Sequence, residues 1–258
     1  MNLFVFEGKS PEYNIIGHIN KHFFNNSLDI VMCTYDGEIY QLYEKMSKED
    51  FALDLFNLVK ERCEENKTLL EQYTRDSFAA IYLFFDYDGH ATRADDNKIK
   101  RMLSFFDNET DNGKLFVSYP MVESILHFKS SEDFKDLIVK CKGQNCLNRD
   151  VCKDKDICKS EQHYKHKVSS YSIPQLLNLN KFDKKLWINI IVSHLKKMNY
   201  IVDGEYVFPI ISHTQFNIFN SQLQKYVSKA CPQIAVLSVF PMFMLDYAGC
   251  KSLQSLLK

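Results

Sequence analysis

Continuous apolar runs alternate with segments of helical spacing along the first 140 residues. Four runs are typical of buried strands, and they lie at residues 3–7, 29–35, 79–89 and 114–120. Apolar positions at helical spacing predict helices between them, at residues 12–24, 48–72 and 95–106. Strands that are apolar throughout are buried on both faces, so the pattern predicts an α/β fold with a parallel sheet flanked by helices.

The pattern changes after residue 140. Residues 141–168 carry almost no apolar side chains, many charges and four of the eight cysteines, which predicts a Cys-rich insertion. Beyond it, helical spacing without strand-like runs of comparable strength occurs at residues 174–180, 183–198, 213–228 and 233–246. We therefore expect three regions: a catalytic α/β domain over residues 1–140, a Cys-rich lobe over 141–168 and a helical C-terminal region over 169–258.

Composition and charge limit the classes of function. A chain of 258 residues with 45% hydrophobic side chains can bury a full core. The net charge of −1 gives no global attraction to polyanions, so binding to nucleic acid needs a local basic surface, a metal or a partner. No apolar run approaches the roughly 18 residues of a membrane span, and the first residues lack the basic region of a signal peptide. These features predict a cytoplasmic protein that is not bound to a membrane.

Acidic side chains follow three of the predicted strands. Glu7 ends the first strand, Asp86 and Asp88 end the third, and Glu123 follows the fourth. Ligands of parallel α/β sheets collect at the carboxyl ends of the strands, and alternate residues of a strand project to the same side. Carboxylates that converge without basic partners repel one another unless a hard cation such as Mg²⁺ or Mn²⁺ binds them. The pattern therefore predicts metal-dependent phosphate chemistry, although Asp-x-Asp is a common sequence and Glu123 also suits the first turn of a helix.

These residues also resemble a known family. The segment "LFVFEG", followed about eighty positions later by "IYLFFDYDG", resembles the motifs of the Toprim fold of topoisomerases, bacterial primases and OLD-family nucleases. The resemblance covers roughly residues 1–130, and "LFVSYPMVES" is similar to the next strand and acid of OLD-like and PARIS-type antiphage effector nucleases. It implies that Glu7 is a general acid/base or metal ligand, that Asp86 and Asp88 bind Mg²⁺, and that Glu123 assists a metal.

The resemblance also implies a function and partners. A Toprim-type nuclease would cleave DNA or RNA, tRNA included, and would be the effector of a bacterial antiphage or abortive-infection system. The chain has no GxxxxGK[ST] motif, the loop that holds nucleotide phosphates in ATPases. An OLD-like system therefore implies a separate ABC/SMC-like ATPase subunit, and it allows a homodimer of the nuclease. The sequence departs from the family in having no topoisomerase nucleophile region and no primase zinc domain at its start.

Two other readings remain open. The strand that ends in Asp86 also resembles the first motif of haloacid-dehalogenase-like phosphatases, in which Asp86 would be the nucleophile and Ser118 would end the second motif. Against this, the Asp-x-Asp strand usually opens that domain, whereas strands precede it here. Alternatively, the chain is a non-catalytic binding subunit whose acids hold a structural cation.

The Cys-rich lobe carries a separate candidate site. Cys141, Cys146, Cys152 and Cys158 follow the spacing C-x4-C-x5-C-x5-C. Four thiolates in a polar stretch can close a tetrahedral Zn²⁺ site that organises a segment with too little apolar surface to fold alone. Free thiols and an iron–sulfur cluster are the alternatives.

Overall fold

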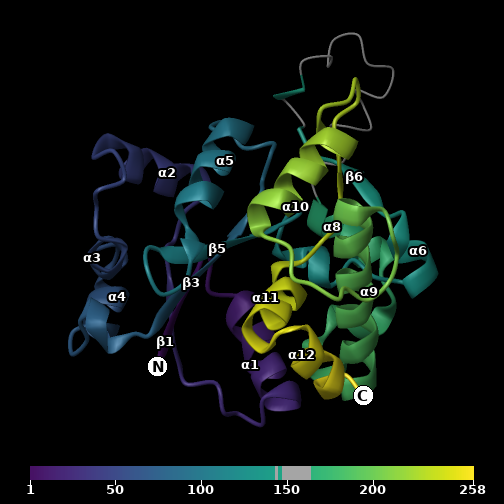
Figure 1. The fold of residues 1–258 in the computed structure, drawn as a ribbon, viewed down its shortest axis with the longest axis horizontal. Coiled ribbons are helices and arrows are strands. Elements are labelled where there is room, and N and C mark those ends of the chain that lie inside the picture. The colour runs from purple at the N-terminus through teal and green to yellow at the C-terminus, as the bar shows by residue number, and fades with distance from the viewer. Residues whose placement is uncertain (143–144, 147–163) are drawn as a thin grey trace. The chain divides into compact units, whose positions relative to one another are not determined.

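The computed structural model describes residues 1–142, 145–146 and 164–258 (Figure 1), which form two compact units. The first unit consists of Met1–Asp86 and Asp95–Val117, and the second consists of Tyr87–Ala94 and Ser118–Lys258. The chain therefore passes from the first unit to the second directly after Asp86. The domain boundary predicted at residue 140 falls inside the second unit.

A five-stranded sheet with the strand order β2-β1-β3-β5-β4 is the centre of the first unit. Strand β1 (Asn2–Phe6) pairs in parallel with both β2 (Ile30–Thr34) and β3 (Ala80–Asp86). Strand β5 (Gly113–Ser118) lies next to β3, and β4 (Asp107–Asn108) runs antiparallel to β5 at the edge. The predicted α/β class and the four predicted strands are confirmed. Strand β4 was not predicted because it has only two residues, both exposed, and so leaves no hydrophobic pattern.

The central strands are held by aromatic packing. All residues of β3 are buried, as are the last four of β1. Phe84 stacks on Phe6 with 4.9 Å between ring centroids and on Phe116 with 5.8 Å, so one aromatic column ties β1, β3 and β5 together. Such pairs contribute about 0.5–1.5 kcal/mol each beyond the area that they bury. The strand ends that carry Glu7 and Asp86 therefore start from a rigid core.

Helices connect the strands of the first unit. They are α1 (Glu12–Phe23), α2 (Ile39–Lys48), α3 (Leu55–Lys60), α4 (Glu64–Leu69), the 3₁₀ turn η1 (Arg75–Ser77) and α5 (Asp96–Phe105). The predictions of α1 and α5 are confirmed.

The single helix predicted over residues 48–72 is wrong, because the chain forms α3 and α4 there and breaks the helical path before each. Asp50 and Phe51 adopt positive φ angles of 45° and 63°, which end the helical path after α2. Helix α3 then starts at a new cap, since the Asp54 carboxylate accepts a hydrogen bond from the Phe56 amide. Apolar residues keep their helical spacing across the breaks, so the sequence pattern predicted one continuous helix.

Buried Asn66 fixes α4 to its surroundings. Its side-chain amide donates to the carbonyl oxygens of Thr34 and Val59, both at 2.8 Å. Thr34 ends β2 and Val59 lies in α3, so one side chain connects the sheet with two helices.

The second unit is mainly helical, as predicted for residues 169–258, but it also contains strands. Its helices and helical turns are η2 (Val122–Ile125), α6 (Ser131–Lys135), α8 (Tyr164–Tyr171), η4 (Pro174–Leu177), η5 (Leu179–Lys181), α9 (Lys184–Asp203), α10 (Gln215–Gln222), the π-helical turn η6 (Leu223–Val227), α11 (Val239–Ala248) and α12 (Cys250–Leu256). Strands β6 (Ile138–Lys140) and β7 (Gln233–Ala235) pair antiparallel. The helix predicted over 233–246 therefore begins only at Val239, because strands of three residues are too short to show a pattern of their own.

The longest helix of this unit, α9, has clear local signals at both ends. The Asp183 carboxylate caps the first turn by accepting from the Leu186 amide at 2.7 Å. Gly204 ends the helix with a φ of 87°, a conformation that glycine adopts without strain. Among the residues that the structure describes, no helix has both the length and the apolar character needed to cross a bilayer.

Candidate functional site

Two of the predicted acids lie side by side at the carboxyl ends of neighbouring strands. The Glu7 amide donates to the carbonyl oxygen of Phe84 at 2.9 Å, which continues the parallel ladder of β1 and β3. The Asp86 amide in turn donates to the Glu7 carboxylate at 3.0 Å. Asp86 is buried, with 7% of its surface exposed. The parallel register thus brings Glu7 and Asp86 together although 79 positions separate them.

A third acid belongs to the same edge and was missed by the sequence analysis. Asp36 follows β2, and its amide donates to the Glu7 carbonyl oxygen at 3.1 Å. Its φ of 53° is left-handed, a conformation that Asp tolerates better than most residues. Three neighbouring parallel strands, β2, β1 and β3, are therefore each followed or ended by an acid. The signal was present as an Asp-Gly pair directly after the predicted strand, which ends at Tyr35.

Glu12 adds a fourth carboxylate to this edge. It is the first residue of α1 and is buried, with 6% exposed. Its Oε1 accepts a hydrogen bond from the Gly8 amide at 3.3 Å. This hydrogen bond places the Glu12 carboxylate against the backbone next to Glu7. An acid in the first turn of a helix is common, and the sequence therefore gave no reason to single it out.

Asp88 belongs to the second unit. Its backbone has a φ of 43°, and its amide donates to the Pro120 carbonyl oxygen at 3.2 Å. Its Oδ1 lies 3.2 Å from Nδ1 of His90. The convergence of Asp88 with Glu7 and Asp86 remains a prediction.

Glu123 is buried and pairs with a cation. It lies in η2, with 8% exposed, and its Oε1 is 3.0 Å from Nζ of Lys165. Its Oε2 is buried and accepts no hydrogen bond from the described residues. The lysine already neutralises this carboxylate, so Glu123 suits a metal ligand less well than Glu7 and Asp86 do.

Ser118, the second residue of the phosphatase reading, is enclosed by backbone. It has 1% of its surface exposed, and its hydroxyl accepts a 3.5 Å hydrogen bond from the Val239 amide. A hydroxyl in this position cannot contact a substrate phosphate without rearrangement of the chain. The surroundings of Ser118 therefore do not favour the phosphatase reading.

The cysteine site lies only partly within the described residues. Cys141 is buried and Cys146 is partly exposed, whereas Cys152 and Cys158 lie outside the described residues. The zinc site therefore remains a prediction. Cys141 follows β6, and its amide donates to the Pro232 carbonyl oxygen at 3.4 Å.

The donor types at the acidic edge fit Mg²⁺ better than zinc. Glu7, Asp86 and Asp36 offer oxygen ligands, whereas zinc prefers nitrogen and sulfur. Over residues 1–142, 145–146 and 164–258, no group of three or more His, Cys, Asp or Glu side chains is close enough to hold a metal ion. Mg²⁺ keeps several waters and needs only one or two protein carboxylates beside a substrate phosphate, so the pair Glu7–Asp86 is a sufficient start.

No family model, curated protein or solved structure matches this chain.

Proposed function

We propose that this protein is a divalent-cation-dependent nuclease that hydrolyses phosphodiester bonds in DNA or RNA, with Glu7 and Asp86 at its active centre. The observation that carries the proposal is the 3.0 Å hydrogen bond from the Asp86 amide to the Glu7 carboxylate, which joins two acids at adjacent parallel strand ends. Asp36 on the next strand increases the negative charge of the same edge. An edge of this kind favours a hard cation and, through it, a phosphate ester.

Each acid has a distinct role in the proposal. Asp86, being mostly buried, would hold Mg²⁺ or Mn²⁺ together with Glu7, and Asp88 would join them as the Toprim resemblance implies. The cation would supply Lewis acidity at a phosphoryl oxygen and lower the pKa of a bound water. The Asp86 amide orients the Glu7 carboxylate, which suits Glu7 to take or return a proton during cleavage.

The biological setting of the proposal also comes from the resemblance. The nuclease would be the effector of an antiphage or abortive-infection system, with tRNA among its candidate substrates. A separate ABC/SMC-like ATPase subunit would control it. Zn²⁺ bound by Cys141, Cys146, Cys152 and Cys158 would organise the Cys-rich lobe.

A cleavage assay tests the catalytic proposal. Purified protein is incubated with tRNA, plasmid and single-stranded DNA in Mg²⁺ or Mn²⁺, with EDTA as the metal-free control. Glu7→Gln and Asp86→Asn keep the side-chain shapes. We expect Glu7→Gln to lower the cleavage rate at least about 100-fold, because general acid–base groups contribute about 10²–10⁴-fold, and Asp86→Asn to lower it by weakening the hold on the cation. Glu71→Gln, at an exposed acid outside the edge, is the matched control and should cleave like the wild type. Equal rates for wild type and Glu7→Gln would refute the nuclease and leave a binding subunit.

A metal analysis tests the zinc proposal. Protein purified without chelator should contain about one Zn²⁺ per chain, and Cys146→Ser should lower this content. Cys250→Ser, at a cysteine outside the lobe, is the control. A wild-type protein with much less than one zinc per chain would remove the zinc site without affecting the cleavage proposal.

A further inference from the structure

The first unit contains a cavity of about 550 Å³ beyond the carboxyl end of β2. Eight residues line it: Tyr35, Lys45, Leu53, Asp54, Asn57, Leu58, Glu61 and Arg62. They come from the β2 end, α2 and the segment that forms α3, all within Met1–Asp86. The sequence pattern did not predict this cavity, because its lining combines three separate segments of the chain.

Arg62 is fixed in the cavity wall by neutral groups alone. Its Nε donates to the Tyr35 carbonyl oxygen at 2.6 Å, and its Nη2 donates to the carbonyl oxygen of Asp36 at 2.7 Å and to Oε1 of Gln41 at 3.4 Å. The guanidinium also lies over the Tyr35 ring, 4.7 Å from its centroid. Burial raises the pKa of Tyr35, so its phenol stays neutral at physiological pH. The charge of Arg62 is thus held in one orientation and is not neutralised, and its Nη1 donates to none of the described residues.

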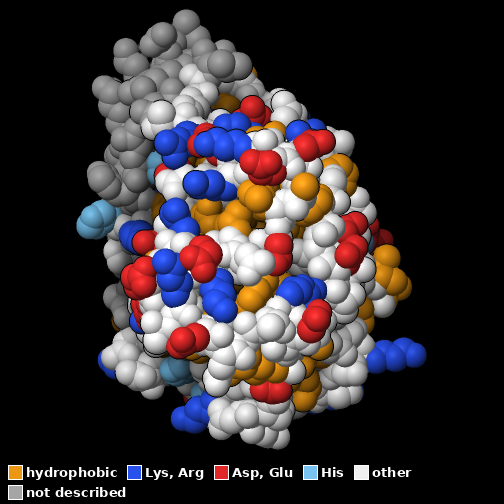
Figure 2. All heavy atoms as spheres, turned by 90° about the vertical axis from the view of Figure 1, so that its left-hand side faces the viewer, with side chains coloured by type: hydrophobic (Ala, Val, Ile, Leu, Met, Phe, Trp, Pro, Cys, Tyr) orange, Lys and Arg blue, Asp and Glu red, His pale blue; other side chains and the backbone are white. Residues whose placement is uncertain are grey.

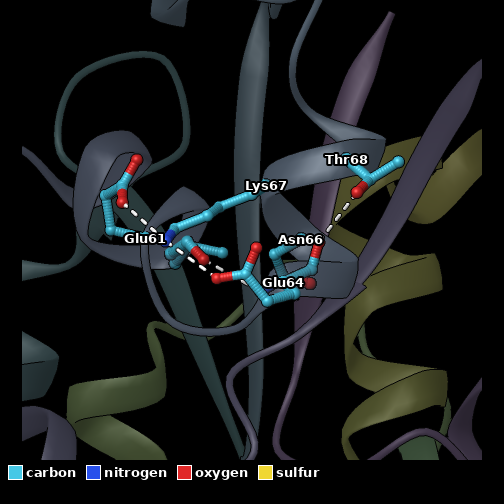
Figure 3. A network of polar contacts seen from close by, with 6 residues as sticks. Glu61, Glu64, Asn66, Lys67 and Thr68 are labelled. Carbon is cyan, nitrogen blue, oxygen red and sulfur yellow. Dashed lines mark hydrogen bonds and ion pairs between the residues drawn. The ribbon is translucent and has the colours of Figure 1, made fainter.

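The acids of the lining are occupied by other partners. Asp54 accepts from the Phe56 amide at 3.0 Å and from the Asn57 side chain at 2.6 Å. Glu61 turns toward Lys67, whose Nζ lies 3.5 Å from Glu61 and 3.0 Å from Glu64 (Figure 3). The hydrogen bond and charge of Glu64, followed by those of Glu61, raise the pKa of Lys67 and keep it protonated. Neither acid of the wall therefore forms an ion pair with Lys45 or Arg62.

Lys45 adds a second positive charge to the wall. It is exposed on α2, and it forms no hydrogen bond or ion pair within the part of the chain that the structure describes. Arg62 and Lys45 are therefore two cations of the lining that pair with neither of its acids, Asp54 and Glu61. A phosphate group satisfies this wall, because it accepts bonds from a guanidinium and pairs with an ammonium.

The remaining wall of the cavity is apolar. Leu53 is 37% exposed, and Leu58 is a second leucine of the lining. Figure 2 looks onto the side that carries α2, α3 and α4, where exposed hydrophobic side chains lie between basic and acidic ones. The flat face of a nucleobase can pack on such leucines, and it can also stack on the plane of a guanidinium. The volume, the two cations and the apolar side chains together match one nucleotide.

We propose that this cavity binds one nucleotide unit of the single-stranded substrate, with its phosphate at Arg62 and Lys45 and its base against Leu53 and Leu58. The cavity adjoins the acidic edge, because Arg62 donates to the Asp36 carbonyl oxygen and the Asp36 amide donates to the Glu7 carbonyl oxygen. A nucleic-acid strand with one nucleotide in the cavity would therefore continue along the sheet edge toward Glu7. This inference rests on the proposed nuclease function and identifies a part of its substrate site.

Binding measured without metal tests this assignment separately from cleavage. The probe is a fluorescein-labelled single-stranded RNA of 12 nucleotides, followed by anisotropy in EDTA over a range of salt concentrations. Removing one phosphate contact reduces the salt slope of a single strand by about 0.7, which corresponds to about fivefold in affinity at 0.1 M salt. We expect Lys45→Gln to show this loss, and Leu53→Glu to lose at least as much because it places a negative charge in the cavity. Arg62→Gln should lose more than Lys45→Gln, because it removes both a charge and a stacking plane.

The control lies on the same helix. Lys48 is exposed at the end of α2 and does not line the cavity, so Lys48→Gln should change affinity much less than Lys45→Gln does. Because Lys45 and Leu53 are exposed, their variants should fold even if Arg62→Gln does not. Equal binding by wild type, Lys45→Gln and Leu53→Glu overturns the assignment, as does an equal loss in Lys48→Gln or an RNA that does not bind at all.

The outcomes also separate the two proposals. If cleavage requires Glu7 but the cavity variants bind RNA as the wild type does, the nucleotide-binding role of the cavity is refuted and the nuclease proposal stands. RNA affinity that depends on Lys45 and Leu53, in a protein that cleaves no substrate, would refute the nuclease alone. In that case the cavity would bind a strand for a non-catalytic subunit.

Discussion

Acidification should destabilise the second unit, because it contains a buried histidine that cannot readily take up a proton. The His127 side chain has none of its surface exposed. Its Nδ1 lies 2.9 Å from the Tyr164 hydroxyl, its ring packs edge-on against Tyr171, and its Nε2 has no hydrogen-bond partner among the described residues. Burial, followed by the charges of Lys167 and Lys197, lowers the pKa of His127 to about 3. The imidazole is therefore neutral in the folded protein.

The sign and size of the effect follow from this shift. In the unfolded chain the pKa of His127 returns to its ordinary value of 6.5. The unfolded state therefore binds the proton first as the pH falls, so the stability present above pH 6.5 is lost between about pH 6.5 and pH 3. From pH 7.5 to pH 5 this one residue should cost about 2 kcal/mol of unfolding free energy. His194 acts in the same direction, because burial and the neighbouring Lys197 and His127 lower its pKa.

The only tryptophan provides the measurement. Trp187 is fully buried in α9, so its fluorescence reports unfolding of the unit that contains His127. Urea unfolding curves at pH 7.5 and pH 5 give the change in free energy for wild type and for His127→Gln, which removes the ionisable ring. The variant should lose about 2 kcal/mol less than wild type over this range, whatever its stability at pH 7.5. The same change at exposed His166 should leave the wild-type difference unaltered, and an unaltered difference in His127→Gln would refute the reasoning.

Three further substitutions test the packing. Asn66→Ala removes the side-chain amide that donates to the carbonyl oxygens of Thr34 and Val59. Because Val59 still accepts from the Arg62 amide, the cost should be about 1–3 kcal/mol, measured by urea unfolding followed by circular dichroism; an unchanged free energy of unfolding would contradict the described contacts. Gly89→Ala places a Cβ 2.6 Å from the Tyr87 ring and 2.8 Å from the Cys141 carbonyl oxygen, so it should destabilise the second unit by about 1–3 kcal/mol. An unchanged midpoint of the urea unfolding curve, followed by Trp fluorescence, would contradict this. Gly17→Ala should instead stabilise α1 by about 1 kcal/mol, because nothing lies within 4 Å of the added Cβ; a lower melting temperature would contradict it.

The sequence predicted the sheet well because its central strands are continuous apolar runs. Strands β1, β3 and β5 are almost wholly buried, and this leaves a strong hydrophobic signal. The side-by-side placement of Glu7 and Asp86 then follows from parallel pairing, which aligns the carboxyl ends of neighbouring strands. Elements that depend on few residues, such as β4 and β6, left no such signal.

The cavity and the outer acids could not be predicted in the same way. In the sequence, nothing distinguishes Arg62 from the other charged residues around it. Only the fold brings the Tyr35 and Asp36 carbonyl oxygens to its guanidinium. The partners of Glu123 and Asp88 are likewise tertiary, since Lys165 lies on a distant helix and the Asp88 conformation depends on a contact with Pro120. The spacing of residues along the chain identifies candidate acids. It does not show which cation or backbone group each acid contacts, because those partners come from distant parts of the chain.

The two Tyr-Asp-Gly turns suggest how the fold holds its acids. In each turn the tyrosine is buried, with 1% exposed for Tyr35 and none for Tyr87, and the aspartate takes a left-handed conformation. In each, the aspartate amide donates to a carbonyl oxygen of another strand end or its extension, at Glu7 for Asp36 and at Pro120 for Asp88.

A left-handed conformation costs a non-glycine residue about 1–2 kcal/mol, and such strain is often retained at functional sites. Asparagine or glycine would adopt the same backbone with less electrostatic repulsion near other acids. Asp tolerates this backbone better than most residues, so the turn alone explains the conformation but does not require the charge. Under the proposed function the carboxylates at the two turns would have a use that asparagine lacks, because a hard cation binds carboxylates in preference to amides. The proposed nuclease therefore predicts that Asp36→Asn and Asp88→Asn keep the fold and lower cleavage.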